Sequence, residues 1–284
     1  MGILRVGVVG LGTMGAGIAQ VCLQAGLEVV GRDVAPELGE RARNRIGHYL
    51  ARGVEKGRLT QDEKDQALER LATTTDLADL AGCQLVIEAA FEDLGVKREL
   101  FAQLDRIVPP PALLATNTSA LSVTQIADAT QTPERVVGLH FFNPAPVLPL
   151  VEVVRTAHAS DDSIEAAFAF ARRVGKEPVA CNDTPGFIVN RILIPLLNDC
   201  VRVLDEARVS PEDLDRGMRF GASWPIGPCA LIDLIGVDVH VHASEALYAA
   251  LGDERMAPPE RLREMQREGL LGRKTGHGFF AYDV

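Results

Sequence analysis

The 284-residue chain has few cysteines and too few basic residues to balance its acids. The five cysteines form an odd set without a Cys-x-x-Cys pair, which favours reduced thiols in a cytoplasmic protein and offers no spacing typical of a metal site. Lysine and arginine total 29 against 39 acidic residues, giving a formal net charge of -10. A duplex binder needs a basic face, so we expect no nucleic-acid partner. An anionic ligand would require a local cluster of positive charge.

Long apolar runs are also missing from the sequence. No stretch approaches the ~18 to 20 uncharged apolar residues that a membrane span requires, so we expect no membrane partner. The first strand-like run, residues 5–9, begins almost at once and leaves no room for a signal peptide, so we expect the cytoplasm, or a matrix compartment after any transit peptide has been removed. With 47% hydrophobic and 24% charged residues, the composition excludes disordered and repeat classes. The length allows two domains.

A glycine-rich turn follows the first strand-like run and precedes a helical run. The glycines stand at Gly10, Gly12 and Gly15. In a dinucleotide-binding turn, the first glycine allows the tight bend, the second lets the backbone approach a pyrophosphate, and the third lets helix and strand pack closely. The pyrophosphate then meets the N–H groups at the start of the helix. Alone, this motif is weak evidence.

A carboxylate at the end of the second strand-like run strengthens the case. Residues 27–31 are largely apolar and lead to Asp33, 18 residues after Gly15. Such an acid is placed to accept hydrogen bonds from the adenine ribose hydroxyls, which favours NAD. Arg32 beside it leaves open a 2′-phosphorylated cofactor, NADP. The combination predicts a Rossmann-type unit.

Later strand-like runs also end in polar side chains, as expected where a parallel sheet delivers groups into a ligand crevice. Residues 85–90 lead to Glu92, residues 113–116 lead to Asn117 and Ser119, and a fifth run ends at His140. For Ser119, an alternative role is the N-cap of a helix beginning near Leu121. Between about residues 36 and 71 the pattern is charged and helical. It predicts two helices joined near Gly57, an insertion of the kind that carries ligand contacts.

His140 and Glu152 flank a proline-rich turn between two apolar runs. A histidine at the end of one strand and a carboxylate on the next can meet at the mouth of the sheet, where the carboxylate would orient the imidazole as a general base. The alternative is a hydrogen-bonded core histidine and a solvated glutamate, because structural ion pairs also place histidine near glutamate.

Turn residues 182–186 mark the expected domain boundary, and the pattern beyond them is helical only. We therefore predict an α/β Rossmann-type dinucleotide-binding domain over residues 1–184 and an all-α domain over residues 185–284. The expected helices of the second domain span residues 187–206, 211–220, 231–251 and 259–266.

These motifs together resemble the 3-hydroxyacyl-CoA dehydrogenase family, in its short stand-alone form similar to bacterial 3-hydroxybutyryl-CoA dehydrogenases. The resemblance covers essentially the whole chain. Its most specific segments are His140-Phe141-Phe142-Asn143-Pro144 and Pro185-Gly186-Phe187 with Asn190-Arg191; the others are the glycine turn, Asn117-Thr118-Ser119, Leu150-Val151-Glu152 and the segment 272–279.

The resemblance implies NAD-dependent oxidation of the 3-hydroxyl of a short-chain (S)-3-hydroxyacyl-CoA. His140 is then the base, Glu152 holds it, and Ser119 and Asn190 bind the reacting oxygen and the thioester carbonyl. Lys56 and Arg52 are implied as contacts to the CoA phosphates, and the C-terminal domain is implied to form a homodimer. The implied cofactor-binding residues are Gly10, Gly12, Thr13, Met14, Gly15, Asp33, Glu92, Lys97, Asn117, Ser119, Asn143 and Lys274.

Two other functions remain open at this point. The first is a dehydrogenase of free 3-hydroxy acids or sugar acids, which would not need Lys56 and Arg52. The second is a catalytically inactive structural or sensor protein that binds the cofactor. The presence of Ser119, His140, Glu152 and Asn190 together argues against the second.

Overall fold

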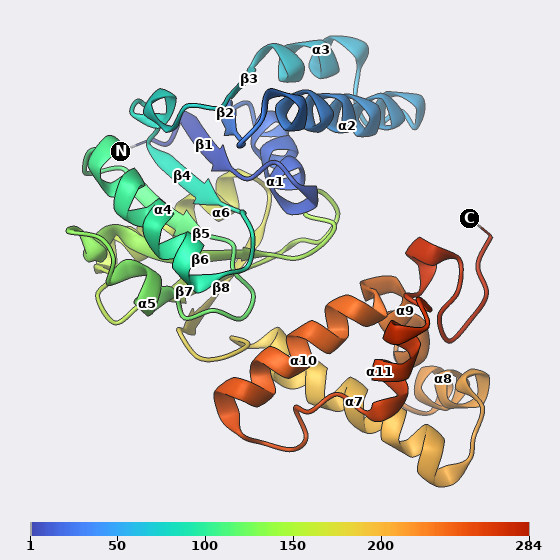
Figure 1. The fold of residues 1–284 in the computed structure, drawn as a ribbon. Helices are drawn as coiled ribbons and strands as arrows, with labels where there is room; N and C mark the ends of the chain where they lie inside the picture. The colour runs from blue at the N-terminus through green and yellow to red at the C-terminus, as the bar shows by residue number, and fades with distance from the viewer. Residues whose placement is uncertain (1, 284) are drawn as a thin grey trace. The chain divides into compact units, whose positions relative to one another are not determined.

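The computed structural model describes residues 2–283, which form two compact units that divide between Thr184 and Pro185. The first is an eight-stranded sheet with helices on both faces, and the second is built from helices (Figure 1). The predicted fold class, a Rossmann-type α/β domain followed by an all-α domain, is confirmed. Each unit has its own hydrophobic core, and each is described by itself.

The sheet has the strand order β3-β2-β1-β4-β5-β6-β7-β8. All neighbours from β3 to β6 run parallel, β7 is antiparallel to β6, and β8 is parallel to β7. The chain order reverses at β1, which pairs with both β2 and β4, and ligands of open α/β sheets bind beyond the carboxyl ends at such a point. The strands are β1 (Arg5–Val9), β2 (Glu28–Arg32), β3 (Leu71–Thr74), β4 (Leu85–Glu88), β5 (Leu113–Thr116), β6 (Val136–Phe141), β7 (Leu150–Arg155) and β8 (Glu177–Asn182).

Two apolar clusters cover the two faces of the sheet, because successive strand side chains point to opposite sides. Val8 packs in the cluster that contains Ile18 and Phe170, while Val9 packs in the cluster that contains Phe101 and Ile126. Helices α1, α2 and α6 thus supply one layer, and α4 and α5 the other. The helices of this unit are α1 (Thr13–Gln24), α2 (Pro36–Glu55), α3 (Gln61–Glu69), α4 (Leu94–Ile107), α5 (Val123–Ala127) and α6 (Asp161–Arg173), with the 3-10 turns η1 (Leu77–Leu80) and η2 (Pro133–Arg135).

The charged segment after β2 contains the two helices expected on either side of Gly57, but it does not stay helical to residue 71. Helix α3 begins at a capping box made by Thr60 and Glu63 and ends at Glu69, and the edge strand β3 follows. β3 was not predicted from the sequence. Its four residues bury only Leu71, so it lacks the apolar run that marks a strand, and its pairing with β2 decides its conformation.

The C-terminal unit packs its helices around Leu197, Ile232 and Val241. The single helix predicted over residues 231–251 is wrong: it is two helices, separated by Gly236, whose φ of +102° no ordinary helix accommodates. Among residues 2–283, no helix has the length and apolar character to cross a membrane. The helices are α7 (Val189–Ala207), α8 (Pro211–Gly221), α9 (Pro228–Ile235), α10 (Val237–Leu251) and α11 (Glu260–Arg267), with the 3-10 turn η3 (Arg273–Thr275).

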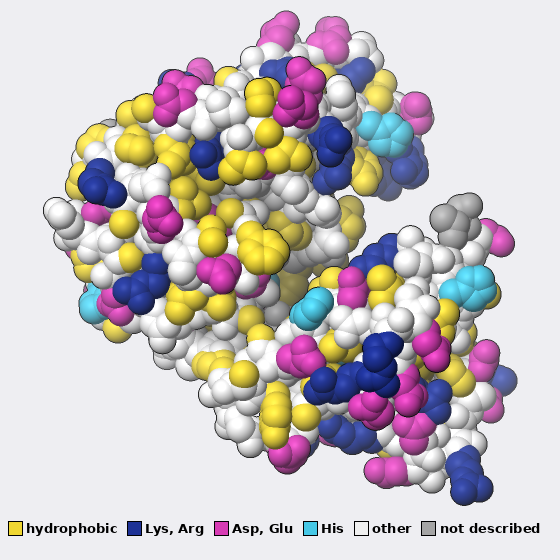
Figure 2. Space-filling model, viewed as in Figure 1, with side chains coloured by type: hydrophobic (Ala, Val, Ile, Leu, Met, Phe, Trp, Pro, Cys, Tyr) yellow, Lys and Arg dark blue, Asp and Glu magenta, His cyan; other side chains and the backbone are white. Residues whose placement is uncertain are grey.

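Charges of both signs mingle on the surface of the helical unit (Figure 2). Several charges of this unit are paired, including Arg263 with Glu245 at 2.7 Å and Arg255 with Asp199 at 2.8 Å. Exposed pairs of this kind contribute little to stability individually. The face in view carries no broad field of one sign.

Candidate active site

The glycine turn between β1 and α1 has the shape that its sequence predicts. Gly10 has a φ of +88°, and a Cβ built on it would lie 2.7 Å from the carbonyl oxygen of Ala89. A Cβ on Gly15 would lie 1.7 Å from the carbonyl oxygen of Gly10, so only glycine lets the helix pack this closely. At Gly12 nothing stands within 4 Å of the added Cβ, which leaves the backbone and the start of α1, at Thr13 and Met14, open to a ligand.

Asp33 lies beside this turn at the end of β2. Its Oδ2 accepts a hydrogen bond from Leu11 N–H at 2.7 Å, and its Oδ1 accepts one from Val34 N–H at 2.7 Å. A cavity of about 590 Å³, within the range of small-molecule sites, is lined by Gly10, Gly12, Arg32, Asp33 and Phe91 among others. Arg32 Nε donates to the carbonyl oxygen of Thr75 at 3.1 Å. The turn and the carboxylate thus border one cavity.

A buried ion pair stands at the ends of β4 and α4. The Lys97 ammonium lies 2.6 Å from Glu88 Oε1 and 3.2 Å from Glu92 Oε2, with the Lys97 side chain 1% and the Glu88 side chain 0% exposed. Glu88 also accepts hydrogen bonds from Thr116 Oγ1 and Ala90 N–H, each at 2.6 Å. The buried Glu88 carboxylate thus accepts hydrogen bonds from an ammonium, a hydroxyl and a backbone N–H. A charge is stable in a buried position only when it is paired and hydrogen-bonded in this way.

This network holds the loop after β5. Glu92 Oε1 accepts hydrogen bonds from Ser119 N–H at 3.0 Å and from the Thr118 hydroxyl. Asn117 N–H donates to the carbonyl oxygen of Glu88 at 2.7 Å, and Asn117 Oδ1 accepts Phe141 N–H at 2.9 Å. The loop thus connects β4 to β6 at the carboxyl edge of the sheet.

Ser119 does not cap the following helix, so that alternative is wrong. Helix α5 begins at Val123, and its N-cap is Ser122, whose hydroxyl accepts Gln125 N–H. The start of α5 is further held by the carboxylate of Asp183, which accepts hydrogen bonds from Thr124 N–H at 2.7 Å and from the Ser122 hydroxyl at 2.8 Å. The side chain of Ser119 is therefore left for another role beside Glu92.

His140 and Glu152 are directly opposite each other in the antiparallel pair β6–β7. His140 Nδ1 lies 2.7 Å from Glu152 Oε2, and the two residues are 5% and 0% exposed. The imidazole also packs on the ring of Phe142, with 4.5 Å between ring centroids. A carboxylate that accepts from Nδ1–H fixes the tautomer in which Nε2 carries the lone pair. This arrangement can perform general acid–base chemistry.

A second cavity, of about 750 Å³, lies between α1, α2 and the loop after β6. We call it the basic groove. Its floor, formed by buried apolar side chains, includes Ala16, Ile46 and Ala145, and its rim carries four exposed basic side chains, Arg45, Arg52, Lys56 and Arg58. Thr13 and Asn143 also line it. Lys56 and Arg52 were expected there, whereas Arg45 and Arg58 were missed. The seven-residue spacing of Arg45 and Arg52, two helical turns, is the signal that predicts a shared face.

Two predicted site residues belong to the C-terminal unit and are described within it. Asn190 is in the first turn of α7 and is partly exposed. Lys274 lies in η3, where its ammonium is 2.5 and 2.6 Å from the two carboxylate oxygens of Asp238 at the start of α10. Their roles toward a ligand remain predictions.

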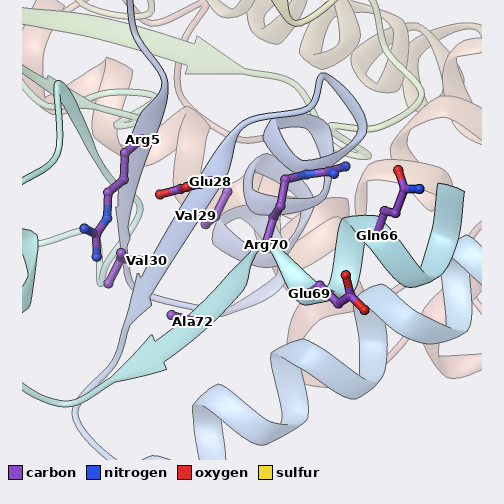
Figure 3. A pocket seen from close by; sticks show the side chains of 8 residues that line it. All are labelled: Arg5, Glu28, Val29, Val30, Gln66, Glu69, Arg70 and Ala72. Carbon is purple, nitrogen blue, oxygen red and sulfur yellow. The ribbon is translucent and has the colours of Figure 1, made fainter.

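A further cavity of about 410 Å³ opens at the amino ends of β1, β2 and β3 (Figure 3). It is lined by Arg5 and Arg70 but also by Glu28 and Glu69, so its charges are mixed. It lies at the sheet edge opposite to the glycine turn and is not part of the candidate site. Over residues 2–283, no cluster of three or more His, Cys, Asp or Glu side chains is arranged to hold a metal ion.

Comparison with known proteins covers both units. Residues 5–184 match the family model described as "3-hydroxyacyl-CoA dehydrogenase, NAD binding domain", and residues 186–282 match "3-hydroxyacyl-CoA dehydrogenase, C-terminal domain". The chain is 43% identical to a "Probable 3-hydroxybutyryl-CoA dehydrogenase" of Deinococcus radiodurans, over 98% of this chain and 100% of that protein. It is 45% identical to a "3-hydroxybutyryl-CoA dehydrogenase" of Mycobacterium tuberculosis, over 99% of each.

A solved structure shares the whole architecture. The (S)-3-hydroxybutyryl-CoA dehydrogenase PaaH1 from Ralstonia eutropha superposes with a TM-score of 0.94 at 41% identity, covering 100% of both chains. The likeness therefore extends through both units, at a sequence identity well above that at which only the fold is shared.

Proposed function

This chain belongs to the 3-hydroxyacyl-CoA dehydrogenase family and binds NAD, and from that premise we propose that it interconverts short-chain (S)-3-hydroxyacyl-CoA and 3-oxoacyl-CoA. The observation that carries the proposal is the buried pair of His140 Nδ1 and Glu152 Oε2, 2.7 Å apart. The pair stands on the same sheet edge as the glycine turn. The relatives named 3-hydroxybutyryl-CoA dehydrogenase support a four-carbon acyl chain.

The residues around the glycine turn fit a dinucleotide. At Gly10 and Gly15 a Cβ would collide with neighbouring backbone atoms, whereas at Gly12 the space beside the backbone is open. The Asp33 carboxylate borders the adjoining cavity. When bound, NAD supplies the acceptor for the hydride of C3. We assign the pyrophosphate to the N–H groups of Thr13 and Met14, and the ribose to Asp33. Glu92, Lys97, Asn117, Ser119, Asn143 and Lys274 retain the cofactor-binding roles implied by the family.

His140 is the proposed base that removes the proton of the 3-hydroxyl group. Glu152 accepts from Nδ1–H, keeps Nε2 as the proton acceptor, and stabilises the imidazolium that forms. In the direction of reduction, the charged imidazolium returns the proton. Ser119 is assigned a hydrogen bond to the reacting oxygen and Asn190 one to the thioester carbonyl, which would fix the substrate for reaction. The role of Asn190 rests on the family resemblance.

The basic groove is the proposed site of the CoA moiety. CoA carries phosphates at one end and an uncharged arm at the other, and the groove pairs a rim of Arg45, Arg52, Lys56 and Arg58 with an apolar floor. Guanidinium and ammonium groups are the side chains that bind phosphate oxygens. This is the local positive charge that an acidic chain needs for an anionic substrate.

We also infer a homodimer formed through the C-terminal unit. On α7, Ile192 is 62% and Val203 is 42% exposed, and their spacing of 11 residues, about three helical turns, places them on one face. Large exposed apolar side chains aligned on a helix are typical of an interface. Sedimentation velocity on the wild type and on the double variant Ile192→Glu, Val203→Glu tests this, with a shift to monomer expected for the variant.

The location that we infer is the cytoplasm. All five cysteines are free, as is typical of proteins in reducing compartments. Burial raises the pKa of the Cys22 thiol to about 12, so this thiol is unreactive. Fractionation of cells that produce the chain tests the location, and recovery in a secreted or membrane fraction would contradict it.

An assay of NADH oxidation tests the function directly. We expect acetoacetyl-CoA to be reduced with NADH at a rate well above that with NADPH, and with a preference for C4 within a C4 to C16 series. Free acetoacetate at the same concentration is the matched control. Turnover of the free acid but not of its CoA ester would favour a dehydrogenase of free 3-hydroxy acids, and no turnover of either would favour an inactive cofactor-binding protein.

A further inference from the structure

One wall of the basic groove is the loop of residues 142–149, which joins the His140 strand to the Glu152 strand. Ala145, Pro146 and Val147 of this loop line the groove. Three of its eight residues are prolines, which have no N–H to donate. Its internal hydrogen bonds run from Val147 N–H and Leu148 N–H to the carbonyl oxygen of Pro144, at 2.9 and 3.0 Å. Such a loop depends on outside donors to fix its shape.

Lys176 supplies those donors. It lies between α6 and β8, is 7% exposed, and its ammonium donates to the carbonyl oxygens of Ala145 at 2.6 Å and Leu148 at 2.8 Å. Burial lowers the pKa of this ammonium. A buried ammonium held by carbonyl oxygens instead of a carboxylate is costly to maintain. The groups that this ammonium binds are the backbone carbonyl oxygens of the loop.

The same loop also packs against α1. A Cβ built on Gly17 would lie 3.2 Å from the Cβ of Ala145 and 3.3 Å from Cδ of Pro146. Lys176 thus holds the backbone of the loop while α1 limits how closely the loop can approach that helix. The width of the groove at this point is therefore fixed between the two contacts.

We propose that Lys176 is a positioning residue that fixes the loop of residues 142–149 as a wall of the acyl-CoA site and so sets affinity for the acyl-CoA. This inference rests on the proposed function of the basic groove. The His140–Glu152 pair is held separately by the β6–β7 ladder, whose register spans residues 138–141 and 151–154. Loss of Lys176 therefore leaves the catalytic pair in place. The cavity beside Asp33 includes no residue of the loop, so that part of the proposed cofactor site is also separate. Asn143 is the loop residue with an implied cofactor role, and it precedes both carbonyl oxygens that Lys176 binds.

Hydrogen exchange tests whether Lys176 fixes the loop, without reference to activity. In Lys176→Met, two carbonyl oxygens lose their donor, and peptides covering residues 142–150 should exchange faster than in the wild type. Glu177→Gln is the matched control, because the exposed Glu177 side chain loses only its charge while its backbone N–H keeps the bond to the carbonyl oxygen of Pro149 at 2.8 Å. Equal exchange in Lys176→Met and the wild type would overturn the proposal.

Steady-state kinetics test the consequence for substrate. We expect Lys176→Met to raise KM for acetoacetyl-CoA roughly tenfold, with kcat and the Kd for NADH each within about twofold of the wild type. Lys176→Gln, whose shorter and uncharged side chain still carries two N–H donors, should lie between the two and takes the place of the Met variant if NADH titration shows that the latter is unfolded. A fall in kcat at unchanged KM would refute the assignment. If the wild type does not turn over acetoacetyl-CoA, the proposed function fails, and the exchange result alone decides whether Lys176 fixes the loop.

Discussion

His140 and Glu152 oppose each other across β6 and β7, with 2.7 Å between Nδ1 and Oε2. Because the two strands are antiparallel and adjacent, their register alone brings the side chains together. Both residues are buried, so the carboxylate acts on the imidazole with little screening by solvent. Because one residue is the proposed base and the other its partner, substitutions of the two residues should affect turnover in different ways.

Replacement of His140 by alanine removes the proposed base. We expect kcat for acetoacetyl-CoA reduction to fall by about 10² to 10⁴ while NADH still binds, because general acid–base groups contribute about that much to rate. Stopped-flow absorbance for turnover and fluorescence titration for NADH measure the two quantities. Activity retained near the wild-type level would remove His140 from the mechanism.

Glu152→Gln keeps the size of the side chain and removes its charge. The amide can still accept from Nδ1–H, but it no longer stabilises a charged imidazole, so we expect kcat to fall by roughly 10² or more. A pH–rate profile compares this variant with the wild type. The idea that the carboxylate supports the imidazolium fails if the two profiles and rates coincide.

Of the polar pairs in the N-terminal unit, the Glu88–Lys97 ion pair should lower the free energy of unfolding most when it is broken. Breaking it with Lys97→Met leaves the Glu88 carboxylate buried with only neutral donors, and we expect the free energy of unfolding to fall by about 3 to 5 kcal/mol. The double variant Glu88→Gln, Lys97→Met should be less destabilised than the sum of the single variants. Urea unfolding gives all three values, and strict additivity would show that the two side chains are not coupled.

Charge reversal tests the basic groove. Arg52→Glu and Lys56→Glu should each raise KM for acetoacetyl-CoA about tenfold, because each removes a hydrogen bond to a charged phosphate. The kcat and the affinity for NADH should change little. The increase should shrink at high ionic strength. Arg41→Glu, on the same helix but outside the groove lining, is the control. Equal KM values for all three variants would place the CoA phosphates elsewhere.

Buried His240 gives the C-terminal unit an acid sensitivity. Burial lowers its pKa from 6.5 to about 4, and its Nε2 lies 2.9 Å from Asn198 Oδ1. As pH falls below about 6.5 the unfolded chain binds a proton that the folded chain does not, so stability present above pH 6.5 is lost down to about pH 4. The shift corresponds to about 3 kcal/mol. Unfolding of the wild type and His240→Gln at pH 7 and pH 4.5 should show a smaller acid loss in the variant, and an equal loss would contradict the assignment.

The sequence determined by itself those features that depend on neighbours along the chain. The glycines of the first turn, the acid at residue 33 and the polar ends of the strands follow from local spacing, and they sufficed to predict the Rossmann-type unit. The two helices around Gly57 also follow from local charge and apolar patterns. The family resemblance added the roles of His140, Glu152, Ser119 and Asn190, which remain predictions.

The tertiary structure alone decided which distant side chains meet. Glu88 and Thr116 are 28 residues apart, and Lys176 and Ala145 are 31 apart, yet each pair is joined by a hydrogen bond of 2.6 Å. No local pattern encodes such contacts, because they exist only after the strands have paired and the polar groups at their ends and in the connecting loops have been buried together. The same reason explains the unpredicted strand β3, which β2 imposes by pairing on a segment with little apolar character.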